Sequence, residues 1–433
     1  MIRTIVTAIF FLIAACKAEP SLDKQKKMNR TLVLGTAAVL YTPFTEVIPS
    51  SGEITIKSAS GNVSRKYEPA CTGTDGNKTF RFLVKKGNSK NLLINFMGGG
   101  ACWDSKNCLG DYTPTYFNKL DSSPSYLIKF LFNGILDYSN ASNPMNDWNM
   151  VFIPYCSGDL HWGSNSLTYK HPSTGASVNF KHKGFDNFLS VLKYIQTNSD
   201  FTPGAGNKIL VIGQSAGGYG TVFNFSHIKE AFPNSETHAF ADASNGVVPA
   251  GFQTQAMANW NVTANLPSWV TGISDSFIQT GDLGDMIYKI SQYYPSSRFA
   301  QYTAEYDGNQ RYFYNVMQVL PTKTYEDKKD FWGSSTGYNV PDSVTCDWRD
   351  KMRLKTSAAA LSSNYRYYIA AGDVHTITTA KEFFSENSGG QTVRDWLFAF
   401  LENKSWTSKD CRTAGSGCKP PATEASPSGV VCK

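Results

Sequence analysis

The chain lacks several features that point to whole classes of protein. Charged residues make up only 18% of its 433 residues, and a formal net charge of +6 is mild over this length. Apart from a short KQKK run near the start, the basic residues are scattered, so we expect no nucleic-acid binding. No CxxC pair and no HExxH motif occurs, which argues against zinc. The sequence therefore predicts neither a metal nor another cofactor.

Long apolar runs are also missing after the first residues, so no later segment is expected to span a membrane. The start, MIRTIVTAIFFLIAACKA, has a positive residue and then a short apolar run that ends in small residues. This pattern is typical of an export signal. Its end at Cys16 resembles the bacterial lipobox, in which the cysteine receives lipid; an ordinary signal cut nearby is the alternative. We expect a signal peptide over 1–15, a lipidated Cys16 and a polar tether over 16–32.

These features predict a bacterial cell-envelope lipoprotein or a secreted protein, attached to a membrane only through its N-terminal lipid. Eight cysteines remain without Cys16, and an even number favours disulfides in an exported chain. The region 33–405 is long enough for one large domain with a sizeable core. The segment 406–433 is rich in Pro, Gly, Ser, Thr and Cys, which predicts a disulfide-pinned tail. We expect a monomer.

Continuous apolar runs of strand length recur along the chain, with helical patterns between several of them. Such runs suit strands that are covered on both faces, as in a parallel sheet. Apolar residues over 184–198 lie on one helical face, and a second helix can extend over 216–232 until Pro233. This order predicts a doubly wound α/β fold with a mostly parallel sheet. The predicted strands are 91–96, 149–155, 208–213, 238–244 and 365–371.

One serine stands out because it lies between a strand and a helix. Gly213-Gln214-Ser215-Ala216-Gly217 fits the pattern G-x-S-x-G and follows the apolar run KILVI. In such a turn the glycines leave room for neighbouring chains, and the hydroxyl projects at the carboxyl end of the sheet. The amide of Ala216 points into the same space at a helix N-terminus. The pattern predicts a nucleophile at Ser215; a serine in a flexible loop is the alternative.

A glycine-rich turn supplies the second feature that a nucleophilic serine needs. The oxyanion of a tetrahedral intermediate requires at least two amide donors. Gly98, Gly99 and Gly100 follow the run NLLINF, as in the glycine turns of esterases. A phosphate-cradling loop is the competing interpretation, but no Lys-Ser/Thr pair follows it.

The base must come from one of only six histidines. Because this architecture has the chain order nucleophile, acid, base, the base lies after Ser215. His375 follows the run YRYYIAA at the expected edge of the sheet and is the predicted base. His227 falls on the helix after the serine, and His238 lies at the opposite end of a strand.

Three aspartates are candidates for the acid. Asp307, in QYTAEYDGNQ, ends an extended segment between the serine and the histidine and is favoured. Asp373 lies two residues before His375, so its side chain would have to turn back under the imidazole. Asp242, on the strand after the serine, could have a structural role instead. The residues alone leave this choice open.

Four blocks of the sequence together resemble the pectin acetylesterase family of Notum-like serine carboxylesterases. They are NFMGGGACWDSKNC, DWNMVFIPYCSGDLHWG, GQSAGG with FADAS, and QYTAEYD followed by AAGDVHT, spread across residues 71–380. The resemblance implies a metal-free serine esterase on an α/β-hydrolase fold. Ala101 stands where the family usually has an aromatic residue, and the C-terminal cysteine pattern also differs, so the substrate stays open.

The resemblance also implies roles for individual residues. The nucleophile is Ser215, the acid is Asp307 and the base is His375. The implied oxyanion donors are Gly99, Gly100 and Ala216, and the implied disulfides are Cys71–Cys156 and Cys102–Cys108.

These observations predict a serine carboxylesterase that hydrolyses O-acyl esters, acetyl esters of a polysaccharide such as pectin foremost. Aromatic residues are plentiful at 13%, and Trp103, Trp162 and Tyr219 are candidates for a substrate pocket, although each could equally lie in the core. One alternative is a catalytically silent protein of the same fold that binds a glycan or a partner protein. Another is a lipase or deacylase for longer acyl chains.

Overall fold

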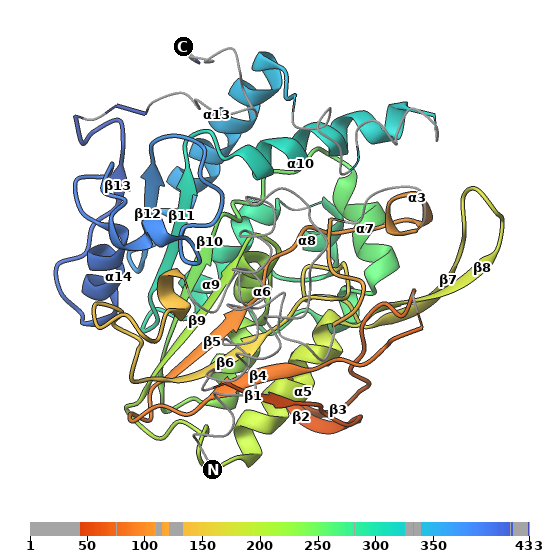
Figure 1. Ribbon diagram of the computed structural model, residues 1–433, viewed down its shortest axis with the longest axis horizontal. Helices are drawn as coiled ribbons and strands as arrows, with labels where there is room; N and C mark the ends of the chain where they lie inside the picture. The colour runs from red at the N-terminus through yellow and green to blue at the C-terminus, as the bar shows by residue number, and fades with distance from the viewer. Residues whose placement is uncertain are drawn as a thin grey trace, which may run out of the picture. The chain divides into compact units, whose positions relative to one another are not determined.

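Figure 1 shows a computed structural model of the chain, which describes residues 44–433 except 75, 110–114, 121–132, 281, 325–331, 333–338, 416, 419–431 and 433. The predicted signal peptide, the lipidated Cys16 and the tether lie outside the described residues and stay predictions. Among the helices that the structure describes, none combines the length and the apolar character needed to cross a bilayer.

A nine-stranded sheet forms the centre of the fold, in the order β1-β4-β6-β5-β9-β10-β11-β12-β13 (Figure 1). Every neighbouring pair from β6 to β13 is parallel, whereas β4 and β1 run antiparallel at one edge. The mostly parallel sheet confirms the predicted fold class. The strands are β1 (Thr45–Val47), β4 (Phe82–Lys85), β5 (Leu92–Phe96), β6 (Asn149–Ile153), β9 (Lys208–Gln214), β10 (Glu236–Asp242), β11 (Phe299–Ala304), β12 (Tyr365–Ala370) and β13 (Lys409–Asp410).

The five predicted strands all form, as β5, β6, β9, β10 and β12, and the two predicted helices form as α5 (Gly184–Thr197) and α6 (Ala216–Ala231). The strands β5 and β6 are completely buried, as their continuous apolar character predicts. The extended segment before Asp307 is β11, which is buried although it contains Gln301 and Thr303. Gln301 satisfies its buried amide by donating to the backbone oxygen of Ser244 at 3.1 Å.

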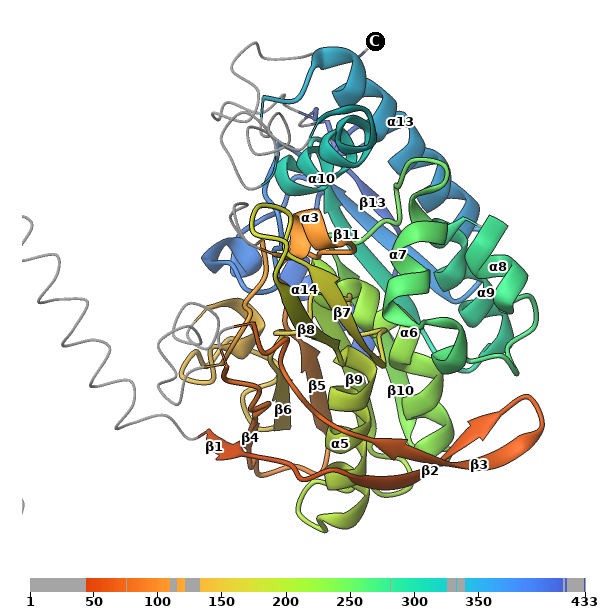
Figure 2. The same cartoon turned by 90° about the vertical axis from the view of Figure 1, so that its right-hand side faces the viewer.

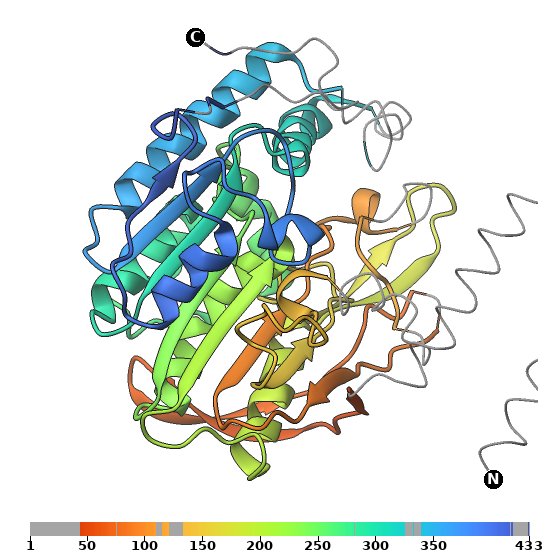
Figure 3. The same ribbon diagram turned by 60° about the vertical axis from the view of Figure 1, so that its left-hand side comes forward.

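Helices cover both faces of the sheet. On one face α6 packs so closely on β9 that a Cβ atom on Gly213 would lie 2.1 Å from the Gly217 oxygen. Successive side chains of a strand point to opposite faces, and Phe240 of β10 therefore faces the other side. There it meets Trp396 of α14 (Val393–Leu401), with the ring centroids 6.0 Å apart. In Figure 3 the blue helix α14 lies in front of the sheet.

Two antiparallel hairpins lie outside the main sheet: β2 (Gly52–Ser58) with β3 (Gly61–Tyr67), and β7 (Asn165–Lys170) with β8 (Ser177–His182). Figure 2 shows the first hairpin extending from the lower part of the domain. The remaining described helices are α3 (Ser105–Cys108), η1 (Gly134–Leu136), α7 (Phe252–Trp260), η2 (Thr263–Asn265), α8 (Asp275–Thr280), η3 (Leu283–Asp285), α9 (Met286–Tyr293), α10 (Gly308–Val319), η4 (Leu320–Thr322), α13 (Asp342–Ala359) and η5 (Lys381–Phe384).

Four disulfides cross-link the domain, which is typical of an exported protein. They are Cys71–Cys156, Cys102–Cys108, Cys346–Cys432 and Cys411–Cys418. The first two are the pairs that the family resemblance implies, and the other two hold the C-terminal segment. Within that segment β13 adds a strand to the sheet edge, and Cys411 is fully buried in a cluster with Trp348 and Met352.

The long-range disulfides should stabilise the fold mainly by restricting the unfolded chain. Cys71–Cys156 spans a sequence separation of 85 residues, whereas Cys102–Cys108 spans only 6. We expect the double change Cys71→Ser, Cys156→Ser to lower the free energy of unfolding by roughly 4 kcal/mol. Cys102→Ser with Cys108→Ser should lower it by less. Urea denaturation without reductant measures both, and equal losses would contradict the loop-length explanation.

Candidate active site

Ser215 occupies a strained turn between β9 and α6. Its backbone angles are φ 54° and ψ −120°, a region that residues other than glycine seldom adopt. Gly217 allows α6 to start directly against the end of β5, because a Cβ atom at this position would lie 1.9 Å from the Phe96 oxygen. The amide of Ser215 donates to the Asp242 oxygen at 2.8 Å, which fixes the turn to β10. The sequence motif thus has the strand–turn–helix context that it requires.

The predicted site residues come together at the carboxyl edge of the parallel strands. Ser215 follows β9, the turn 98–100 follows β5, Asp307 follows β11 and His375 follows β12. Parallel strands end at the same edge of a sheet, so these loops are neighbours. Backbone hydrogen bonds from Tyr306 N to the Gly372 oxygen (2.9 Å) and from Gly308 N to the Asp373 oxygen (3.2 Å) join the last two loops.

His375 and Asp307 form a close pair. The Nδ1 atom of His375 lies 2.8 Å from Oδ1 and 2.9 Å from Oδ2 of Asp307. Asp307 is fully buried, and its carboxylate also accepts from the backbone N and the Nε2 atom of Gln310, at 2.8 and 3.0 Å. The geometry therefore favours Asp307 among the three aspartates, while Asp373 supplies a backbone acceptor to Gly308.

The surroundings of His375 shift its protonation equilibrium. Burial of the ring disfavours the charged form, but the charge and hydrogen bond of Asp307, together with the charge of Asp242, outweigh burial and raise the pKa of His375 above its ordinary value. The side chain is only 14% exposed. A neutral imidazole here can accept a proton, and the imidazolium that results is stabilised by the neighbouring carboxylate.

Asp242 holds the loop that carries His375. One carboxylate oxygen accepts from Ile377 N at 3.2 Å, and the other accepts from the amide and the hydroxyl of Thr378 at 2.8 and 2.6 Å. Gln214, the residue before the serine, donates its amide to the same hydroxyl at 3.0 Å and to Asn95 at 2.9 Å. Burial raises the pKa of Asp242 to about 6 despite these donors. The Asp242 carboxylate thus holds the loop of His375, which is the structural role that the sequence analysis offered as an alternative.

The turn after β5 carries Gly99 and Gly100, two of the three predicted oxyanion donors. Gly100 has φ 74°, and a Cβ atom there would lie 2.5 Å from the Thr115 hydroxyl, so only glycine fits. Within the described part of the chain, no acceptor is found for the amides of Gly99, Gly100 or Ala216. The buried side chain of His161 contacts the residue before this turn: its Nε2 atom lies 2.9 Å from the Met97 oxygen.

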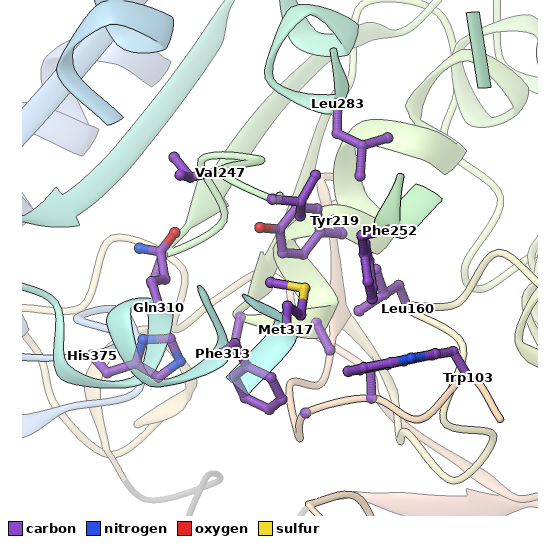
Figure 4. Close-up of a pocket in the computed structure, with 16 residues that line it drawn as sticks. Trp103, Leu160, Tyr219, Val247, Phe252, Leu283, Gln310, Phe313, Met317 and His375 are labelled. Carbon is purple, nitrogen blue, oxygen red and sulfur yellow. The ribbon is translucent and has the colours of Figure 1, made fainter. Parts of the chain in front are cut away.

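Ser215 and His375 both line one cavity of about 70 Å³ (Figure 4). Gly100, Ala101 and Ala216 contribute to its wall, so the predicted nucleophile, base and two of the predicted amide donors share one space. Most of the remaining wall is apolar, formed by Trp103, Leu160, Tyr219, Val247, Phe252, Leu283, Phe313 and Met317.

Of the three aromatic candidates from the sequence, Trp103 and Tyr219 line this cavity, whereas Trp162 lines a smaller cavity that also borders on Tyr219.

Sequence reasoning missed Leu160, whose backbone is held at φ 58° in the block YCSGDLHWG. Buried Asp159 shapes that block by accepting from Ser157 Oγ at 2.6 Å and from Gly184 N at 2.7 Å. The pair Gly158-Asp159 directly before Leu160 was the sequence signal that could have indicated a tight turn here.

Two groups of side chains have ligand atoms close enough for a metal ion. They are Cys102, Cys108 and His182, and Glu305, Cys411 and Cys418. The cysteines of both groups are joined in disulfides, so they do not offer the thiolates that bind metals. The cavity at Ser215 is lined by neither group.

The fold and the grouping at Ser215 define an α/β-hydrolase-type protein. A family model described as Pectinacetylesterase matches residues 63–252. Curated relatives are named palmitoleoyl-protein carboxylesterase: NOTUM of Homo sapiens is 27% identical over 180 residues (40% of this chain, 34% of that one), and notum1a of Danio rerio is 31% identical over 164 residues (37% and 30%). The crystal structure of the Wnt deacylase Notum from Drosophila covers 85% of this chain and 99% of its own, with a TM-score of 0.54 and 16% identity.

These comparisons confirm a resemblance to the pectinacetylesterase family and to proteins named Notum, as the sequence blocks within residues 63–252 indicated. The matched region contains the glycine turn and Ser215, whereas Asp307 and His375 lie beyond residue 252. The chain spans about a third of the length of the curated relatives it matches. At 16% identity the structural match shows the fold alone.

The His375–Asp307 pair makes a prediction that needs no substrate. NMR titration of the imidazole should give a midpoint above the ordinary value of 6.5, because Asp307 stabilises the imidazolium. The change Asp307→Asn removes the charge that opposes the effect of burial on His375, so the midpoint of the imidazole should move to lower pH. Asp373→Asn is the matched control and should move it much less. A larger shift in the control would assign the acid to Asp373.

A second prediction concerns Asp242. Asp242→Asn leaves one carbonyl oxygen for three buried donors, and we expect unfolding to become easier by about 1–3 kcal/mol. The His375 titration should also move to lower pH, since a nearby negative charge is lost. Thermal unfolding and NMR measure the two effects, with Asp200→Asn on the surface as the control. An unchanged His375 midpoint would show that Asp242 does not act on the base.

Proposed function

We propose that the chain is a serine carboxylesterase that hydrolyses O-acyl esters, with Ser215 as nucleophile, His375 as base and Asp307 as acid. The observation that carries the proposal is the contact of both Asp307 oxygens with His375 Nδ1, on a ring that lines the same cavity as Ser215. A carboxylate on Nδ1 leaves Nε2 as the nitrogen that can accept a proton.

The first step forms an acyl-enzyme. His375 Nε2 takes the proton of Ser215 as Oγ attacks the acyl carbon, and the carbonyl electrons move to its oxygen. The amides of Gly99, Gly100 and Ala216 stabilise this oxyanion. When the carbonyl reforms, the bond to the alcohol oxygen breaks and His375 gives its proton to the departing alcohol.

The second step releases the acid. A water molecule gives a proton to His375 and attacks the acyl carbon, and the same amides hold the second oxyanion. Its collapse breaks the bond to Ser215 Oγ, which takes the proton back from His375. Asp307 orients the ring and stabilises the imidazolium in both steps.

The cavity at Ser215 limits which acyl groups the protein can accept. Its volume of about 70 Å³ is several times the 10–15 Å³ that one water needs on this measure, so a short acyl group such as acetyl fits in it. We propose an acetylated polysaccharide such as pectin as the substrate, in keeping with the Pectinacetylesterase family model. The apolar wall favours a second candidate, a deacylase for longer chains, as the relatives named palmitoleoyl-protein carboxylesterase suggest.

We further propose that the protein acts outside the cytoplasm as a monomer, with Cys16 as a lipid anchor in a bacterial cell envelope. The four disulfides support export. Mass spectrometry of the N-terminal peptide from the protein's native host tests the lipid.

Hydrolysis of p-nitrophenyl acetate tests the esterase. We expect Ser215→Ala to lower kcat by about 10⁴-fold or more, because the nucleophile is lost. In the unchanged protein, kcat/KM should fall on acidification with a midpoint above pH 6.5, since the neutral form of His375 is required and its pKa is raised. Equal rates for the two proteins would favour a silent binding protein instead.

A further inference from the structure

The cavity at Ser215 has two different ends. At one end Trp103, Phe252 and Met317 also line a larger cleft of about 580 Å³. The rest of that cleft includes the polar side chains of Ser105 and Lys106. A hydroxyl-rich alcohol can be solvated and hydrogen-bonded there.

At the other end, Tyr219 and Leu283 separate the cavity from a second, smaller one. Both residues line both spaces. The smaller cavity has a volume of about 10 Å³, no more than one water requires. Its wall is largely apolar, with Trp162, Val222 and Ile287 among its residues.

Tyr219 lies four residues after Ser215, in the first turn of α6, and both residues line the cavity. Its hydroxyl oxygen accepts from Gly246 N at 3.2 Å, and its backbone oxygen accepts from Trp162 Nε1 at 3.0 Å. The Trp162 ring packs edge-on against the tyrosine ring, with the ring centroids 6.2 Å apart. The ring of Tyr219 is therefore held from two sides.

Leu283 belongs to η3, which reaches the same place from a distant part of the chain. Its side chain is buried, and Figure 4 shows it above Tyr219, away from His375. A Cβ atom on the neighbouring Gly284 would lie 3.2 Å from the Asn245 oxygen, so η3 is packed against the loop after β10. The wall thus consists of a fixed ring and a fixed aliphatic side chain.

We propose that Tyr219 and Leu283 form a wall that limits the length of the acyl chain. The acyl group then extends from Ser215 toward this wall, and the alcohol extends toward the polar cleft at Trp103. This proposal rests on the proposed esterase activity and assigns the short-chain preference to two residues. Tyr219 and Leu283 act on specificity, and neither takes part in proton transfer.

Removing the wall should change which esters react. Without the tyrosine ring the two apolar cavities join, and a longer chain can bury further methylenes. Each buried methylene is equivalent to about 0.8 kcal/mol, or about fourfold in kcat/KM. Two or more newly buried methylenes therefore correspond to an increase of about tenfold or more for the longer ester.

The experiment compares p-nitrophenyl acetate, butyrate, hexanoate and octanoate. For the unchanged protein we expect kcat/KM to fall from acetate to octanoate. Tyr219→Ala and, separately, Leu283→Ala should each raise the octanoate-to-acetate ratio of kcat/KM by about tenfold or more. Tyr219→Phe is the matched control: it keeps the ring and should keep the ratio of the unchanged protein.

Several outcomes would overturn the proposal. One is an unchanged protein that already prefers octanoate to acetate; another is a folded alanine variant at either position with the original ratio. Circular dichroism checks folding, and if Tyr219→Ala does not fold, Leu283→Ala tests the same wall from the opposite side. Absence of hydrolysis of every ester by the unchanged protein would instead contradict the esterase function itself.

Discussion

The arrangement at the sheet edge depends on one buried aspartate. The backbone oxygen of Asp242 accepts from Ser215 N, and its carboxylate accepts from the amides of Ile377 and Thr378. A buried carboxylate is unfavourable unless donors satisfy it. Here the donors come from the loop that carries His375, so the same bonds that satisfy Asp242 fix that loop. The turn at Ser215 and the loop of His375, far apart in sequence, are thereby tied to a single residue of β10.

The two faces of the sheet contribute to the site in different ways. On the α6 face, glycines allow helix and strands to approach closely, which forces Ser215 into its turn. On the opposite face Asn95, Gln214 and Thr378 form a buried polar network beside Asp242. Close contact and one hydrogen bond to Asp242 position the turn at Ser215, whereas hydrogen bonds to the Asp242 carboxylate position the loop of His375. Buried networks of this kind specify one geometry because partly satisfied alternatives are costly.

The sequence predicts local features well and non-local ones poorly. Ser215 and His375 could be placed because each follows an apolar strand whose direction is evident. The residues alone favoured Asp307 but left Asp242 and Asp373 open, because the choice depends on the pairing of β11 with β12, which no local pattern records. The strands β1, β4 and β13, at or next to the edges of the sheet, are short, so their periodicity is too weak to detect. Leu283 could not be found, since it joins the site through packing alone.

This division explains why resemblance to a family does not determine the acyl group. The predicted reacting groups lie at strand ends, where the sheet fixes their positions, and the sequence blocks cover these ends. In our proposal the depth of the cavity is set by Tyr219, in the first turn of α6, and by Leu283 of η3, and η3 lies outside the region that the family model matches. A change of one side chain there alters the space available without disturbing the hydrogen bonds of His375. The proposed chemistry and the proposed chain-length preference are therefore assigned to separable parts of the fold, so that the latter can vary while the former is kept.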